Sequence, residues 1–175
     1  MDVDEFEETK REMIALLPRL RAFARALTRD QAMADDLVQL GCEKALRNLG
    51  GYTPGTRLDA WLFRIIRNSW IDDRRAQRRF QLVADPTELD TMGEDGRDAI
   101  HARLELRDVA RAMAGMEQEQ REVLMLIGVN GMRYREAAEA LDIPIGTVMS
   151  RLSRARRALA AMVHGETAPG KQGIR

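Results

Sequence analysis

The stretch RYREAAEALDIPIGTVMSRLSRARRAL, residues 133–159, decides the fold of this chain. Its first half has Ala137, Ala138 and Leu141 at helical spacing, and Pro144 and Gly146 follow at once, so a helix must end near residue 142. A second helix then begins, and its apolar residues recur at spacings of four, three, four and three. These residues are Val148, Leu152, Ala155, Leu159 and Met162. Residues 133–159 therefore predict a helix-turn-helix.

The face of the second helix roughly opposite this apolar stripe is basic. It carries Ser150, Ser153, Arg154 and Arg157, and residues 147–159 hold four arginines and no acid. Arginines with small hydroxyls between them suit the phosphates and base edges of a DNA major groove. A solvated basic surface on an ordinary helical hairpin is the alternative, but the turn directly before a basic helix favours DNA binding.

Charge is unevenly distributed along the 175 residues. Lys and Arg number 28 and Asp and Glu number 28, so the formal net charge is zero. Acidic residues are concentrated in residues 1–12 and 85–108, and the basic charge lies in two blocks elsewhere. Hydrophobic residues make up 45% of the chain and recur periodically, which predicts a folded protein. The pattern fits an all-α protein of two small helical domains joined by an acidic, flexible linker.

Composition argues against catalysis and against membrane insertion. A single cysteine, Cys42, excludes an internal disulfide and a thiolate-rich zinc site, and His101 and His164 lack ligand spacing. No phosphate-binding loop or nucleophile with an adjacent base is evident, so we expect no enzyme activity, cofactor, metal or small-molecule substrate. No apolar run reaches membrane-spanning length, and the acidic N-terminus differs from a secretory signal, which predicts a cytoplasmic protein. Cys42 fits a core position better than a redox sensor.

Three helices are expected in the first 80 residues, at about 6–27, 32–48 and 58–79. The first is expected to be interrupted near Pro18, and its apolar side is lined by Leu17, Leu20, Ala24 and Leu27. The second has a buried stripe of Val38, Cys42, Ala45 and Leu49. Asp36, Gln39, Glu43 and Arg47 lie across from it, with Leu40 exposed among them. This face is equally compatible with a protein-docking surface and with a solvated polar face.

The helix at 58–79 combines a packing stripe with a basic face. Leu62, Ile66 and Trp70 form the stripe, while a different face carries Trp61, Arg64, Asn68 and Arg75. The helix ends with Arg74, Arg75, Arg78 and Arg79, and such groups can hold nucleic acid. Trp61 is equally compatible with a core position. Tyr52, on the preceding glycine-rich loop, either stacks on a base or folds back onto the core.

Helical periodicity is lost after this basic helix and resumes near residue 99. We predict domains at residues 1–80 and 99–164, an acidic linker at 81–98 and a disordered tail at 165–175. Further helices are expected at about 99–112 and 118–129, before the helix-turn-helix.

Together these features resemble the extracytoplasmic-function (ECF) group of bacterial sigma factors. The resemblance is carried by ADDLVQ at residues 34–39, by YTPGTRLDAWLFRIIRNSWIDDRR at 52–75 and by IPIGTVMSRLSRARRAL at 143–159. It implies an alternative sigma factor that binds core RNA polymerase, through the clamp helices of its largest subunit and its flap, and directs transcription initiation. The docking residues so implied are Asp35, Asp36, Gln39, Leu40 and Glu43.

The resemblance also implies two promoter-binding surfaces. Tyr52 and Asn68 match a pocket for a base flipped out of the minus-ten element, Trp61 and Arg64 belong to the same segment, and Arg74, Arg75, Arg78 and Arg79 would meet backbone phosphates. Thr147, Ser150, Arg151, Arg154 and Arg157 match the recognition helix for the minus-thirty-five element. Met149 stands in that helix where many members have a basic residue. Gly41 is a second departure, since a glycine inside a helix costs about 1 kcal/mol relative to alanine.

Two other functions remain compatible with the sequence. A stand-alone helix-turn-helix regulator would explain residues 133–159 but would leave the aromatic, basic helix at 58–79 without a role. A decoy that imitates a sigma factor in order to sequester an anti-sigma factor would have no use for the DNA-facing arginines. The resemblance itself implies an anti-sigma factor that clamps the two domains and hides both the docking face and the recognition helix.

Overall fold

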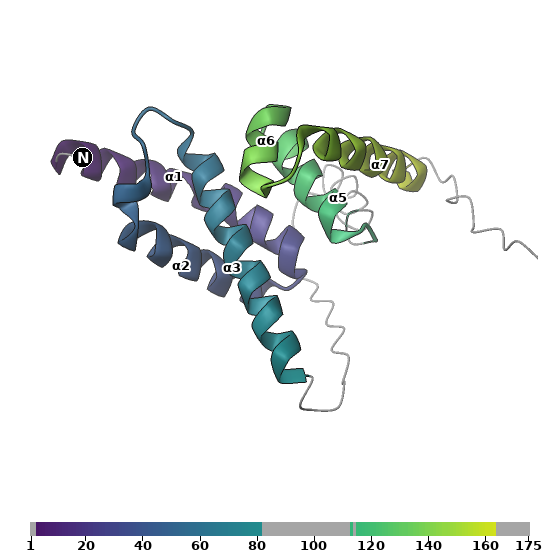
Figure 1. Cartoon of the computed structure of the whole chain (residues 1–175), viewed down its shortest axis with the longest axis horizontal. Helices are drawn as coiled ribbons and strands as arrows, with labels where there is room; N and C mark the ends of the chain where they lie inside the picture. Colours follow the sequence, from purple (N-terminus) through teal and green to yellow (C-terminus); the bar gives the residue numbers. More distant parts are fainter. Residues whose placement is uncertain (1–2, 82–112, 114, 164–175) are drawn as a thin grey trace, which may run out of the picture.

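The computed structural model describes residues 3–81, 113 and 115–163, and within these ranges the regular structure is entirely helical (Figure 1). The order is α1 (Val3–Thr28), α2 (Gln31–Arg47), the short 3-10 turn η1 (Leu49–Gly51), α3 (Leu58–Gln81), α5 (Gln118–Val123), the π-helical turn η2 (Leu124–Val129), α6 (Tyr134–Leu141) and α7 (Ile145–Val163). The predicted all-α class is confirmed. The predicted linker, the helix at 99–112 and the tail lie outside the described residues.

Helices α1, α2 and α3 pack against one another and form the N-terminal module. Leu20, Phe23, Leu62 and Ile66 are almost fully buried between them. Gly41 of α2 lies against Ile66 of α3: a Cβ atom at Gly41 would come within 2.6 Å of Cγ1 of Ile66. The glycine that weakens α2 as a helix is therefore what lets α3 pack closely against it.

The expected interruption at Pro18 is wrong, because α1 runs unbroken from Val3 to Thr28. A proline inside a helix removes the hydrogen bond to the carbonyl four residues earlier, here that of Ile14. Both Ile14 and Pro18 are exposed, so water can solvate the carbonyl that loses its partner. The break predicted after residue 27 is found, and Asp30 caps α2 by accepting a hydrogen bond from the Met33 N–H at 2.8 Å.

The C-terminal module consists of α5, η2, α6 and α7, and its last two helices form the predicted helix-turn-helix. Asp142 ends α6 in the left-handed conformation, with φ of 51°. Val148, Leu152 and Ala155 of α7 are buried as expected, and Leu159 is half-buried. Met162 is 44% exposed, so the apolar stripe fades one turn earlier than predicted, where α7 extends past the helices it packs on.

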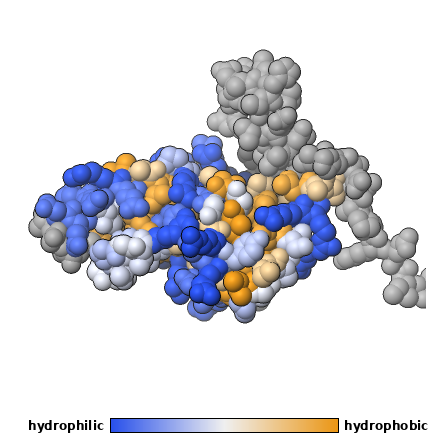
Figure 2. Space-filling view, turned by 90° about the horizontal axis from the view of Figure 1, so that it is seen from above, coloured by the Kyte–Doolittle hydropathy of each residue, from blue (hydrophilic) through white to orange (hydrophobic). Residues whose placement is uncertain are grey.

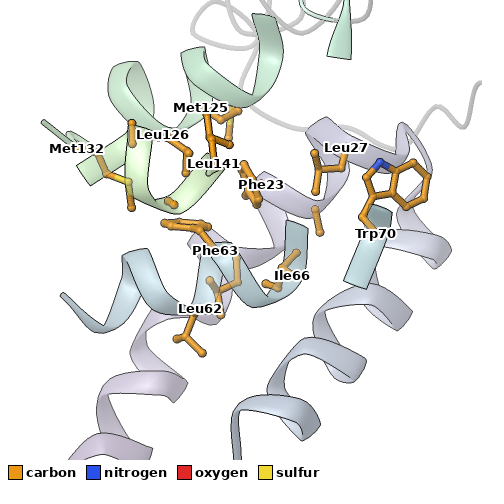
Figure 3. Close-up of a cluster of buried hydrophobic side chains, with 14 of the residues drawn as sticks. Phe23, Leu27, Leu62, Phe63, Ile66, Trp70, Met125, Leu126, Met132 and Leu141 are labelled. Carbon is orange, nitrogen blue, oxygen red and sulfur yellow. The ribbon is translucent and has the colours of Figure 1, made fainter. Parts of the chain in front are cut away.

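The two modules are in direct contact, and one hydrophobic core is continuous across them. Phe23 and Phe63 of the N-terminal module meet edge to face, with ring centroids 4.9 Å apart. Figure 3 shows this pair pointing toward Leu126, Met132 and Leu141 of the C-terminal module. We call this contact the module junction. It fixes where the exposed faces of α2, α3 and α7 lie relative to one another.

Candidate polymerase and promoter interfaces

The face of α2 opposite its buried stripe is polar and exposed, as the sequence predicted. Asp36, Gln39 and Arg47 are exposed, and Leu40 is 39% exposed among them. A chain of hydrogen bonds runs along this face, since Gln39 donates to Glu43 at 3.2 Å and Arg47 donates to Glu43 at 3.4 Å. The arrangement is a single apolar side chain framed by carboxylates and an amide, which can serve as a docking surface.

Asp35, also predicted to dock, lies beside this face and pairs with Arg21 of α1 at 3.3 Å. Both side chains are close to half exposed, so the pair can exchange Arg21 for another cation at little cost.

The basic face predicted on α3 is present. Arg64, Asn68, Arg75 and Arg78 are exposed on it. Arg74 lies over the ring of Trp70, with the guanidinium carbon 5.3 Å from the ring centroid, so the buried tryptophan orients an exposed cation. Exposed arginines with an amide one turn away can contact a phosphate backbone and a base edge together.

Tyr52 folds back onto the core rather than being displayed, which decides between the two alternatives that the sequence left open. Its side chain is 9% exposed, its hydroxyl donates to the Thr56 carbonyl at 2.8 Å, and its ring lies 5.4 Å from that of half-buried Trp61. Burial raises the pKa of the Tyr52 phenol. In this form the two aromatic residues support the loop before α3, while Asn68 stays accessible.

The loop that carries Tyr52 also lies beside the acidic start of α1. Glu5, Glu8, Glu12 and Thr56 help to line a hollow of about 300 Å³ between them. Figure 2 shows hydrophilic residues gathered at this end of the molecule. Carboxylates beside the loop repel phosphates, so this end disfavours DNA while the exposed α3 face favours it.

The solvent-facing side of α7 carries the predicted recognition residues. Met149, Ser150, Arg154 and Arg157 are exposed, whereas Thr147 and Arg151 are half-buried at the edge of the helix-turn-helix. The Ser150 hydroxyl donates to the Thr147 carbonyl at 3.0 Å, and Arg154 Nε lies 3.4 Å from the Ser150 carbonyl. The helix therefore presents arginines and a methionine outward, while Val148 and Leu152 hold it to the module.

The rim of the module junction is formed by charged groups that sequence reasoning missed. Arg19 of α1 donates through Nε to the Asn130 side chain at 2.9 Å, and through Nη2 to the Asn130 carbonyl and to Asp59 at 3.0 Å each. Arg57 pairs with Glu136 of α6 at 2.6 Å and Arg67 with Glu122 of α5 at 2.9 Å. The partners that meet across the junction are 55 to 111 residues apart, so they leave no periodic pattern in the sequence.

Two further arginines join helix ends across the junction. Arg121 of α5 is 4% exposed and donates to the carbonyls of Ala26 and Met116, while Arg29, after α1, donates to the Met116 carbonyl at 3.1 Å. The last carbonyls of a helix lack intrahelical partners and carry partial negative charge. Arg121 therefore caps the end of α1, much as Arg19 caps the end of η2.

Electrostatics at the junction follow from this pairing. Burial acts to raise the pKa of Asp59, but hydrogen bonds and positive charge from Arg57, with the Ala60 N–H and Arg19, hold that pKa below its ordinary value. Burial lowers the pKa of Arg121. The ionised form of Asp59 is therefore the one that binds Arg57 and Arg19 beside the junction.

The described residues contain no group of three or more histidine, cysteine or acidic side chains placed to hold a metal ion. Cys42 is half-buried, and burial raises the pKa of its thiol, which disfavours the reactive thiolate. Among the helices described, none has the length and apolar character needed to cross a membrane.

Comparison with known proteins gives the family of the chain. The family model Sigma-70 region 2 matches residues 13–80, and the model Sigma-70, region 4 matches residues 106–159. The ECF RNA polymerase sigma factor EcfG of Rhodopseudomonas palustris is 38% identical over 153 residues, covering 87% of this chain and 83% of that protein. The ECF RNA polymerase sigma factor SigL of Mycobacterium tuberculosis is 34% identical over 140 residues, 78% of each chain.

The fold is also similar to that of a solved sigma factor structure. The sigma factor RpoE of Bartonella quintana, crystallised with the anti-sigma factor NepR, superposes with a TM-score of 0.81 at 34% identity, covering 92% of this chain and 99% of that one. Proteins of this family are transcription initiation factors rather than enzymes. The chain belongs to the ECF RNA polymerase sigma factors of the sigma-70 family.

Proposed function

We propose that this protein is an alternative sigma factor that binds core RNA polymerase, directs it to a set of promoters and is held inactive by an anti-sigma factor. One observation carries the proposal. The apolar stripes of α2, α3 and α7 are buried, while each helix exposes a polar face whose chemistry suits a different partner. The mixed face of α2 suits a protein, and the basic faces of α3 and α7 suit DNA.

In this proposal the predicted site residues take the roles implied by the family, except that Tyr52 supports the loop beside the base pocket. Asp35, Asp36, Gln39, Leu40 and Glu43 dock on the clamp helices of the largest polymerase subunit. Asn68 takes a base unstacked from the minus-ten element, Arg64, Arg74, Arg75 and Arg78 hold its backbone, and Tyr52 and Trp61 shape the loop beside them. Thr147, Met149, Ser150, Arg151, Arg154 and Arg157 face the minus-thirty-five element. The protein acts in the cytoplasm, where the polymerase transcribes.

We call the arrangement seen in the structure, with the two modules in contact, the closed form, and in it the two DNA faces lie closer together than the two promoter elements. Arg64 lies seven residues after Arg57, about 10 Å along a helix. Thr147 lies eleven residues after Glu136, which spans at most about 40 Å, and the paired side chains of Arg57 and Glu136 add about 15 Å. Arg64 and Thr147, one on each DNA face, are thus within about 65 Å of each other, whereas elements about 25 base pairs apart are separated by about 85 Å.

The modules must therefore separate before the chain spans a promoter. Core polymerase can supply the free energy for this by binding each module at the required spacing. An anti-sigma factor that prefers the closed form would oppose the separation. The solved relative was crystallised in complex with the anti-sigma factor NepR, which supports the expectation that an anti-sigma factor binds this chain.

Run-off transcription with core polymerase on a pool of promoter fragments tests the proposal. We expect the wild-type chain to start transcripts at a defined subset, Asn68→Ala to block promoter opening, and Arg154→Ala to weaken closed-complex binding. Gln77→Ala, an exposed change on α3 that removes no charge and no predicted DNA contact, is the control and should behave as wild type.

Two results would favour the other functions. A salt-resistant operator complex formed without core polymerase would favour a stand-alone regulator. No transcripts from core plus this chain, together with retained binding of an anti-sigma factor, would favour a decoy.

A further inference from the structure

Arg67 of α3 is covered, whereas two arginines further along the same side of the helix are exposed. Arg67, Arg74 and Arg78 are spaced by seven and four residues, so they follow one another along one side of the helix. Arg74 and Arg78 are exposed, whereas the side chain of Arg67 is only 14% exposed. Arg67 is thus the first member of a basic row, and in this structure it alone of the three is covered.

The group that covers Arg67 is a buried carboxylate of the C-terminal module. Glu122 Oε2 accepts from Arg67 Nε at 2.9 Å, and the Glu122 side chain is 2% exposed. Its other oxygen accepts from Gln118 at 2.8 Å. A guanidinium binds carboxylate and phosphate oxygens with the same donor geometry. Glu122 therefore occupies, on Arg67, the place that a DNA phosphate oxygen would take.

The neighbouring pair between Arg57 and Glu136 differs in one respect. Arg57 also binds Asp59 of its own module, at 2.7 Å, and would keep that partner after the modules separate. Among the ion pairs of the described residues, Arg67 has only Glu122, which leaves with the C-terminal module. Arg67 is consequently a cation of α3 that becomes available when the modules separate.

We propose that Arg67 is a DNA-phosphate-binding residue of the open form, and that Glu122 masks it in the closed form by standing in for the phosphate. Closure of the modules and binding of DNA along α3 then compete for one guanidinium. The inference rests on the proposed function, in which α3 lies against promoter DNA. It adds a contact at the junction end of the row formed by Arg74 and Arg78, and it links that contact to the separation of the modules.

Salt dependence of DNA binding measures the contact directly. Each phosphate neutralised by a protein cation adds about 0.9 to the slope of log K against log salt on duplex DNA. The probe is a fluorescent duplex of mixed sequence, about 20 base pairs long, titrated with full-length chains by anisotropy over a salt series. The variants are Glu122→Gln, Arg67→Gln and the double variant, compared with wild type.

We expect Glu122→Gln to bind more tightly and with a steeper slope than wild type. In that background Arg67→Gln should reduce the slope by about 0.9, whereas in the wild-type background it should leave the slope nearly unchanged. The control is Glu119→Gln, which removes the same charge from an exposed position of the same helix and should bind as wild type. Equal effects of Arg67→Gln in both backgrounds, or no effect in either, would overturn the proposal.

A second measurement uses holoenzyme and does not depend on the folding of Glu122→Gln. With core polymerase on a promoter fragment, Arg67→Gln should lower the salt slope of binding by about 0.9 while transcripts start at the same position. An unchanged slope would overturn the role of Arg67. If wild-type holoenzyme starts no transcripts at all, the proposed function fails instead.

Discussion

The contact between α2 and α3 differs from the contact between the two modules in the side chains that form it. The first is tight and apolar, with Gly41 placed against Ile66 and both residues buried. The second has an apolar centre at Phe23 and Phe63, but its rim consists of arginines bound to carboxylates and helix-end carbonyls. A polar rim around an apolar centre is typical of interfaces that form and separate.

This difference indicates that each module moves as a unit and that motion between them occurs at the junction. Breaking the α2–α3 contact leaves apolar surface with no new partner, so it unfolds the N-terminal module. Breaking the junction rim exposes charges that water or DNA can satisfy. The two contacts should therefore respond differently to substitution, salt and pH.

The largest effect is expected from Leu62→Ala. Leu62 is 1% exposed in the N-terminal module, and removing a buried leucine costs about 2 to 5 kcal/mol of unfolding free energy. Chemical denaturation followed by circular dichroism measures it. The matched change Gln77→Ala, exposed on the same helix, should stay within about 0.5 kcal/mol of wild type. Equal stability of the two variants would contradict the assignment of the core.

The second largest effect is expected from Gly41→Ala. Whether this change raises or lowers the free energy of unfolding distinguishes the effect of packing from that of helix propensity. Alanine would gain up to about 1 kcal/mol as a helix residue, but forcing a methyl against Ile66 costs about 1 to 3 kcal/mol. We expect a net loss of stability. Gly146→Ala in α7, where a Cβ atom meets nothing within 4 Å, should instead raise stability. A stabilising Gly41→Ala would show that α2 and α3 are not in close contact.

Arg19→Ala should open the junction with little unfolding. The variant removes three hydrogen bonds that join α1 to Asn130 and Asp59, but water replaces them, since Arg19 is 39% exposed. Small-angle scattering should give a larger radius of gyration at unchanged helix content, and added salt should do the same to wild type. Arg25→Ala, exposed on the same helix, is the control. An unchanged radius would mean that the apolar centre alone holds the modules.

The smallest effect concerns pH. The pKa of Asp59 is lower in the folded protein than its ordinary value, so the carboxylate contributes stability above the ordinary aspartate range. That contribution is lost as pH falls through the folded-state pKa. The stability difference between wild type and Asp59→Asn should therefore shrink from about pH 7 to about pH 3. A difference that is constant or grows on acidification would contradict the ionised pair.

Periodicity predicted much of this molecule. The helix boundaries of α2, α3, α6 and α7, the buried stripe of α3 and the exposed basic faces all follow from apolar residues at helical spacing. These features are local, because each depends on residues within one helix. The roles of the exposed residues came from resemblance to a family and stay predictions.

The features that sequence reasoning missed depend on distant partners or on solvent. Pro18 stays within α1 because its neighbourhood is exposed, which periodicity does not report. The role of Gly41 depends on Ile66, in another helix. The π-helical turn Leu124–Val129 precedes Asn130, which Arg19 holds from 111 residues away. A lone arginine in a sequence does not indicate which carboxylate it will meet.

Distance between the modules tests the central claim most directly. Cys42 is the single cysteine, so a Cys42→Ser chain with Arg25→Cys on α1 and Ala160→Cys on α7, both exposed positions, can carry a donor and an acceptor dye. We expect high energy transfer in the free protein and low transfer in the promoter-bound holoenzyme. High transfer in an active promoter complex would contradict a sigma factor whose modules must separate to reach both promoter elements.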